Sequence, residues 1–149
     1  MAQTTASISF ANAIVYMSTD GASWTDISGY VQMVTVSGFP RQIGEFYTFT
    51  GSGPIIQASK QGSGTVTLDF AYTEEAGGPY KVSLTAYNNN TPFYVRWLPK
   101  GTTTGNYRFT SSAGIVPNQP LPQGDASKGD IAKVSLPVRI GSITQDTAP

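Results

Sequence analysis

Short stretches in which apolar and polar residues alternate recur along this chain. The most regular one runs from Thr65 to Tyr72, where every second residue is aliphatic or aromatic. Because successive side chains of a β-strand point to opposite faces, this pattern predicts a strand with one face in the core and the other in water. The residues expected in the core are Val66, Leu68, Phe70 and Tyr72. The opposite face carries Thr65, Thr67, Asp69 and Ala71.

Four other stretches have the composition of strands. Residues 93–98 and 131–140 alternate in the same way, and Ala13 to Ser18 forms a shorter apolar run. Residues 30–37 are rich in β-branched side chains and apolar on both sides over their middle, which predicts a strand covered on both faces. Pro137 cannot donate a ladder hydrogen bond, so its strand is expected at a sheet edge or a bulge. These strands add Val95, Trp97, Val134 and Leu136 to the predicted core.

Glycine and proline residues separate these stretches, as is typical of strands joined by turns. Thr19-Asp20-Gly21 is one such turn signal. Two Gly-Ser-Gly sequences, at 51–53 and 62–64, are also interpreted as turns, since neither is followed by the Lys-Ser/Thr and helix of a phosphate-binding loop. The predicted fold class is therefore mainly β, a two-sheet β-sandwich in a single domain over residues 1–149.

One segment, at about 77–89, predicts a short flanking α-helix. Pro79 suits the first turn of a helix, and a run of asparagines ending at Asn90 can close it with a left-handed cap. Tyr80, Leu84 and Tyr87 recur at the spacing of one helical face, so Leu84 is expected in the core.

The segment from Gly38 to Gly64 is too apolar for a loop that faces only water. It predicts either further ordinary strands, above all over Glu45 to Thr50, or an arm that needs a partner surface, and a protruding hairpin would satisfy both. Residues 145–149 are expected to be a frayed end or a second, smaller contact arm. The residues expected to make the contacts of the long arm are Phe39, Arg41, Ile43, Phe46, Tyr47, Phe49 and Ile55.

The composition excludes much catalytic and metal chemistry. The 149 residues include nine basic and nine acidic side chains, no histidine and no cysteine. Thiolate nucleophiles, disulfides, the usual zinc ligands and a side chain that titrates near neutrality are all missing. A net charge of zero also lacks the excess of cations on which binding to nucleic-acid phosphates depends. We therefore expect no enzyme, no cofactor and no metal site.

The remaining acidic pairs have simpler explanations. Glu74 and Glu75 are adjacent, so in a strand they face opposite sides and cannot act together as general acid and base. They are expected to place favourable charge near the start of the following helix. Asp125 and Asp130 lack the ligand spacing of a calcium loop and predict a turn.

Trp24 and Arg96 leave two questions open. Trp24 follows a hairpin turn and could serve as a stacking platform for sugars, which makes a carbohydrate- or receptor-binding β-sandwich of a virion the alternative function. Arg96 is expected to be solvated or, as the other possibility, to pair with Asp69 across strands.

No targeting or membrane segment is expected. Residues 1–5 carry no positive charge, and the apolar run at 13–17 is too short for a signal sequence or a membrane span. We therefore expect synthesis inside the cell and no membrane partner.

The order of several segments resembles that of the major tail tube proteins of long-tailed bacteriophages. The resemblance is carried by SWTDISG at 23–29, TVTLDFAYTEE at 65–75, FYVRWLPKG at 93–101 and DAS at 125–127. It spans most of the chain and includes the single helix between the second and third of these segments.

Resemblance to this family implies hexameric rings that stack into a hollow tail tube through which DNA is ejected. One sheet of each subunit would join its neighbours into an inner barrel, and a long loop, here residues 38–64, would reach the adjacent ring. The implied partners are further copies of the chain, the tail tip, terminator and tape-measure proteins, and DNA that passes without specific binding. The implied location is the virion tail, with assembly in the host cytoplasm.

A conduit for DNA must not hold phosphate, so Thr65, Thr67 and Asp69 are the candidates for the face toward the lumen. Lys133 and Arg139 fit this picture less well, because two cations per subunit would line the channel if their strand face turned inward. We expect that face to lie outside or to be paired with carboxylates.

Overall fold

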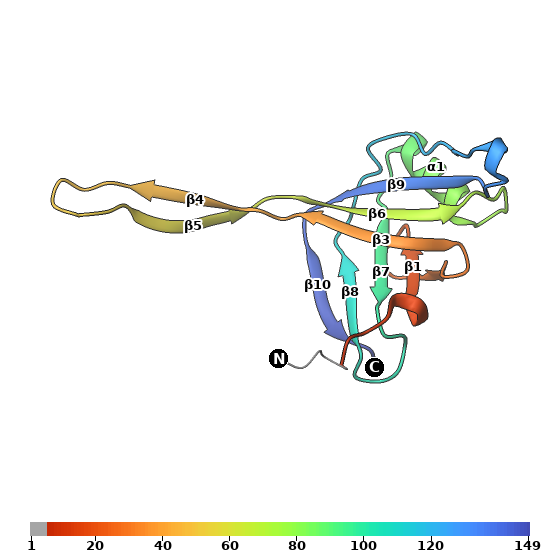
Figure 1. Cartoon of the computed structure of the whole chain (residues 1–149), viewed down its shortest axis with the longest axis horizontal. Coiled ribbons are helices and arrows are strands. Elements are labelled where there is room, and N and C mark those ends of the chain that lie inside the picture. Colours follow the sequence, from red (N-terminus) through yellow and green to blue (C-terminus); the bar gives the residue numbers. More distant parts are fainter. Residues whose placement is uncertain (1–5) are drawn as a thin grey trace.

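The computed structural model describes residues 6–149. Residues 1–5, on which the expectation about targeting partly depends, lie outside the described residues. Two antiparallel sheets form a sandwich, and a two-stranded hairpin projects from it (Figure 1). The five-stranded sheet has the order β10-β8-β7-β1-β2, with bounds Ile143–Thr147, Tyr107–Ser111, Tyr94–Leu98, Ile14–Ser18 and Thr25–Asp26. The three-stranded sheet has the order β3-β6-β9, with bounds Val31–Gly38, Gly64–Ala71 and Lys133–Ile140. The hairpin consists of β4 (Arg41–Phe46) and β5 (Ile55–Gln61).

The core lies between the two sheets, whose strands run across one another in Figure 1. The alternation in β6 places its three largest apolar residues in this core, each no more than 1 % exposed. β1, β7 and β9 contribute their inward residues to the same cluster. Of the residues expected in the core, the buried ones are Val66, Leu68, Phe70, Val95, Trp97, Val134 and Leu136.

The helix α1 (Pro79–Asn89) begins with proline in its first turn and ends at Asn90, which adopts a left-handed conformation with φ of 52°. Its most buried residues are Pro79, Ser83 and Ala86, whereas Leu84 is only half-buried, so the predicted core face needs correction. The small Ser83 can approach the core closely because its hydroxyl donates to the Tyr80 carbonyl oxygen at 2.9 Å. The face of α1 with small side chains is the buried one, because these side chains let the helix lie close to the core.

The C-terminal segment is neither frayed nor a contact arm. β10 pairs with β8 along its whole length, and Ala148 is only 5 % exposed. Asp146 accepts a hydrogen bond at 2.8 Å from Nε of Arg108 across this pair. The cross-strand ladder, together with this ion pair, holds the segment in the sheet.

Both outer strands of the three-stranded sheet are edges. β9 is one of them, which confirms the prediction from Pro137 that this strand lies at an edge. β3 is the other, and Met33 and Val36 on it remain 51 % and 41 % exposed. The prediction that residues 30–37 are covered on both faces is therefore wrong for the single chain, because Met33, beside Asp69 on the outward face, and Val36, beside Val66 on the core side, are both exposed.

We predict that Gly114→Ala destabilises the sandwich. Gly114 exchanges backbone hydrogen bonds with Phe93, and a Cβ added there would lie 2.5 Å from Val138 Cγ1 and 2.8 Å from Ile140 Cγ2. Overpacking of this kind costs about 1–3 kcal/mol of the free energy of unfolding, measured by urea titration. Gly29→Ala is the matched control, because nothing lies within 4 Å of its added Cβ. Equal urea midpoints for the two variants would contradict the close packing at Gly114.

Candidate assembly surface

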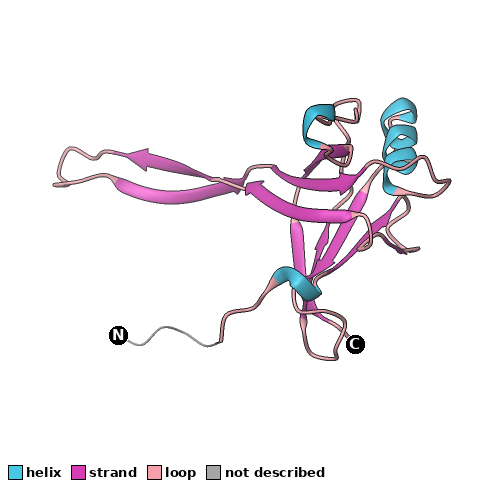
Figure 2. Cartoon of the chain, turned by 45° about the vertical axis from the view of Figure 1, so that its right-hand side comes forward, coloured by secondary structure: helices cyan, strands magenta, loops and turns pink. Residues whose placement is uncertain are grey.

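The hairpin formed by β4 and β5, with its tip at residues 47–54, is called the arm here. It extends far from the sandwich in both views (Figures 1 and 2). Every residue of its two strands is exposed. The segment 38–64 was predicted to form either further strands or a protruding arm, and the structure shows two strands that protrude as a hairpin. Of the residues expected to make contacts, Arg41, Ile43, Phe46 and Ile55 lie on its strands and Tyr47 and Phe49 at its tip.

The arm is apolar on both of its faces. Its register pairs Phe46 with Ile55 and Glu45 with Ile56. Opposed residues point to the same side and successive residues to opposite sides, so Ile43 and Ile56 share one face while Phe46 and Ile55 share the other. The four side chains are between 58 % and 67 % exposed. An isolated two-stranded hairpin is marginally stable in water, and this one has apolar side chains to bury on two sides.

Phe39 belongs to the base of the arm and not to its contact surface. Its ring lies over Gly64, where an added Cβ would come within 2.3 Å of the ring, and it packs against the core. Its backbone has φ of 61°, and its N–H donates to the Ser63 carbonyl oxygen at 3.2 Å. Gly62 N–H donates to the Pro40 carbonyl oxygen at 2.7 Å. The Gly-Ser-Gly sequence at 62–64 is therefore the junction with the sandwich and not a turn.

The face of the three-stranded sheet that points away from the core carries Thr65, Thr67 and Asp69, as the alternation predicts. The register with β9 pairs Thr65 with Arg139 and Ala71 with Lys133. Paired residues project to the same side, so both cations share the face of the lumen candidates. The expectation that Thr65, Thr67 and Asp69 face the lumen and the expectation that the cations of β9 lie outside it therefore cannot both hold, whereas pairing of the cations with carboxylates stays a prediction. The strand register decides this, and the sequence of either strand alone does not specify it.

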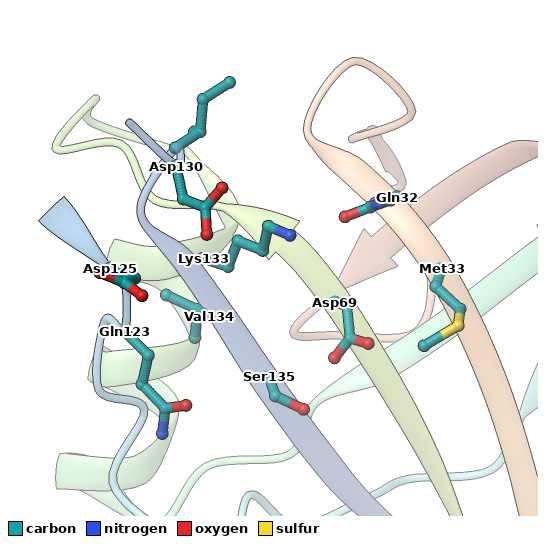
Figure 3. A pocket seen from close by; sticks show the side chains of 11 residues that line it. Gln32, Met33, Asp69, Gln123, Asp125, Asp130, Lys133, Val134 and Ser135 are labelled. Carbon is teal, nitrogen blue, oxygen red and sulfur yellow. The ribbon is translucent and has the colours of Figure 1, made fainter. Parts of the chain in front are cut away.

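Carboxylates surround one of these two cations. Lys133 extends into an open groove of about 750 Å³ whose lining includes Asp69, Asp125 and Asp130 (Figure 3). Within residues 6–149 no carboxylate lies within 4.0 Å of Lys133, so these carboxylates line its groove without a direct ion pair. One oxygen of Asp69 is buried without a hydrogen-bond partner in the described part of the chain. Arg139 is held differently, by donation from Nε to Ser63 Oγ at 3.1 Å.

The outward face of the five-stranded sheet brings Arg96 and Trp24 together. The guanidinium carbon of Arg96 lies 3.9 Å from the centroid of the Trp24 ring, and its Nε donates to Thr110 Oγ1 at 3.0 Å. Asp69 lies in the other sheet, so the predicted alternative pairing of Arg96 with it is wrong. Burial lowers the pKa of Arg96, so its guanidinium is not simply solvated either. Because the guanidinium covers the Trp24 ring, the arrangement does not favour a sugar-stacking platform.

The two glutamates before the helix bind tyrosines. Tyr72 donates to Glu74 at 2.7 Å, Tyr30 donates to Glu75, and each hydrogen bond raises the pKa of its tyrosine. The first turn of α1 contains no acidic residue, so the prediction of favourable charge at the helix start is wrong. Asp125, in contrast, caps a short 3-10 turn by accepting from Ser127 N–H at 2.9 Å, and the predicted turn is confirmed.

Residues 6–149 contain no group of three or more acidic side chains placed to hold a metal ion. None of the helices in that range has the length and apolar character needed to cross a membrane.

Comparison with solved structures identifies the fold. A chain in the six-fold symmetrised baseplate of the anti-feeding prophage aligns with a TM-score of 0.68 and 10 % identity over 98 % of this chain and 97 % of the other. A chain in the tube-terminating cap of that particle gives 0.63 and 15 % over 99 % and 96 %. A chain in the virion of a gene transfer agent gives 0.62 and 8 % over 99 % and 100 %. No protein-family model and no curated protein matches the sequence. The chain has the fold found in these phage tail-like particles.

The packing of Phe39 predicts that Phe39→Gly loosens the base of the arm. Glycine accepts the positive φ, so the variant removes the ring over Gly64 without adding backbone strain. We expect trypsin to cut faster after Arg41 and Lys60, which lie on the two strands of the arm next to its base, as measured by mass spectrometry over time. Phe49→Gly removes the same ring at the exposed tip and should leave the cleavage rate unchanged. Equal cleavage of all three proteins would show that Phe39 does not hold the junction.

Proposed function

We propose that the chain is a structural, non-enzymatic subunit of a phage tail-like tube, in which hexameric rings stack and enclose a channel for DNA. The observation that carries this proposal is the arm, whose two apolar faces have no partner within the described chain. The fold shared with components of tail-like particles supports the same proposal. The arm would bury its side chains on subunits of the adjacent ring.

Ring closure would use the edges of the three-stranded sheet. An open edge is an aggregation hazard, and a closed ring removes it by pairing each subunit with the next. β3 offers Met33 and Val36 at its edge. Next to β9, backbone bridges already attach Ile115 to Arg139 and Gln123 to Lys133, and Ile115 is 58 % exposed. In the proposed ring, β3 of one subunit lies against this bridged side of its neighbour, where apolar side chains meet.

The face of Thr65, Thr67 and Asp69 would line the channel. It is mostly hydroxyl-bearing, which gives DNA phosphates little to bind. Lys133 also faces the channel, but the three carboxylates of its groove outnumber it. Neither Lys133 nor Arg139 has a carboxylate within 4.0 Å among the described residues, and Ser63 engages the Nε of Arg139. The wall proposed to face the channel is therefore not a continuous cationic track.

We predict that polar substitution on the arm abolishes assembly and leaves the subunit folded. The double variant Ile43→Ser, Ile56→Ser removes the apolar side chains of one face, and both are exposed in the single chain. Assembly is followed by sedimentation and negative-stain microscopy of the concentrated protein. We expect tubes or rings for the wild type, monomers for the double variant, and the same unfolding temperature for both.

Gln57→Ser on the same arm is the matched control and should assemble normally, because it replaces one exposed polar residue by another. Normal tubes from the double variant would contradict the role of the arm. A wild-type protein that remains monomeric at high concentration, also after a tail tip is added as a seed, would contradict the proposed function itself.

A further inference from the structure

Arg96 carries a positive charge that the described chain does not neutralise. The two ion pairs within residues 6–149 join Arg108 to Asp146 and Lys128 to Asp125, and neither includes Arg96. Stacking on Trp24 and donation to Thr110 fix the plane of its guanidinium. A guanidinium that is partly desolvated, immobilised and unpaired is prepared to bind an anion.

The neighbouring arginine shows the contrast. Arg108 lies on the same face, and both its Nε and one terminal nitrogen donate to the carboxylate of Asp146. That cation is therefore satisfied within the chain. Together Arg96, Arg108 and Asp146 carry two positive charges and one negative charge. The surplus equals the charge of one carboxylate, whereas a phosphate group at neutral pH carries nearly two.

The side chain of Arg96 lines a small cavity on the outward face of the five-stranded sheet. Its volume is about 240 Å³, and Tyr16, Thr102, Arg108 and Pro149 line it together with Arg96 and Trp24. Pockets for small-molecule ligands usually measure about 300–1,000 Å³. The cavity is thus better matched to one inserted side chain than to a nucleotide or a sugar. Leu98 and Ala148 add apolar wall to it, which suits the methylene stem of an acidic residue.

We infer that the cavity lined by Arg96 and Trp24 receives an aspartate or glutamate side chain of a partner protein that lies against the five-stranded sheet. A planar guanidinium can hold a carboxylate through two parallel hydrogen bonds, and its stacking on an aromatic ring leaves its edge for this purpose. In the proposed tube the three-stranded sheet faces the channel, so this cavity faces outward. That location rests on the proposed function, whereas the binding chemistry does not.

The test uses the unassembled full chain and a blocked peptide, acetyl-Gly-Gly-Glu-Gly-Gly-amide, followed by the NMR signal of the Trp24 indole N–H. We expect a saturable shift that Arg96→Gln weakens at least about tenfold, as the loss of a charge-assisted hydrogen bond does. Arg96→Lys should bind with intermediate affinity, because lysine keeps the positive charge but cannot form two parallel hydrogen bonds with a carboxylate. Lys128→Gln removes the same charge at an exposed site that does not line the cavity and should bind like the wild type.

Two further titrations decide the chemistry. The glutamine version of the peptide should leave the Trp24 signal unshifted, and inorganic phosphate should bind more weakly than the glutamate peptide. The inference is overturned if the glutamine peptide binds equally, if Arg96→Gln binds as tightly as the wild type, or if phosphate binds more tightly. None of these measurements requires assembly, so a failure here and a failure to form tubes are separate results.

Discussion

Exposure of apolar side chains to water is unfavourable, and in this chain many such side chains lie on the arm and on β3, where no other part of the described chain covers them. The arm has two strands and no third layer, so side chains on both of its faces stay in solvent. On the edge strand β3, the apolar side chains of Met33 and Val36 are also exposed to solvent. The sandwich beside them is well packed, with several core residues fully buried. The contrast between a complete core and an incomplete periphery supports the proposal that this chain assembles with further copies of itself.

The charge of the chain is also compatible with association between copies. A chain with equal numbers of acidic and basic residues has little long-range repulsion between copies, which favours close association. The few charges have local functions. Asp146 fixes β10 to β8 through Arg108, and the two glutamates before the helix hold tyrosines. Lys133 sits among carboxylates, and Arg96 is left with a partly desolvated charge on the opposite sheet.

The features that were predictable from the sequence depend on neighbours along the chain. Alternation identified the two faces of β6, and the asparagine run identified the left-handed cap at Asn90. The errors concern contacts between distant segments. Leu84 was expected in the core because it recurs with Tyr80 and Tyr87 on one helical face, yet α1 packs through Ser83 and Ala86. The shared face of Lys133 and Thr65 follows from strand register, and the stacking of Arg96 on Trp24 joins a strand to a loop some seventy residues away. No local pattern specifies such pairs.

The central claim is that the face of Thr65, Thr67 and Asp69 lines an enclosed channel, and the absence of native cysteine makes it directly measurable. A single cysteine at Thr67→Cys is compared with one at Thr144→Cys, which lies on the outward side of the five-stranded sheet. Each assembled protein is treated with N-ethylmaleimide and with maleimide coupled to albumin, which is too bulky to enter a narrow channel. The account predicts that the Thr67 site reacts only with the small reagent and the Thr144 site with both, while both sites react with both reagents before assembly. Equal reaction of the Thr67 site with albumin-maleimide in assembled tubes would contradict it.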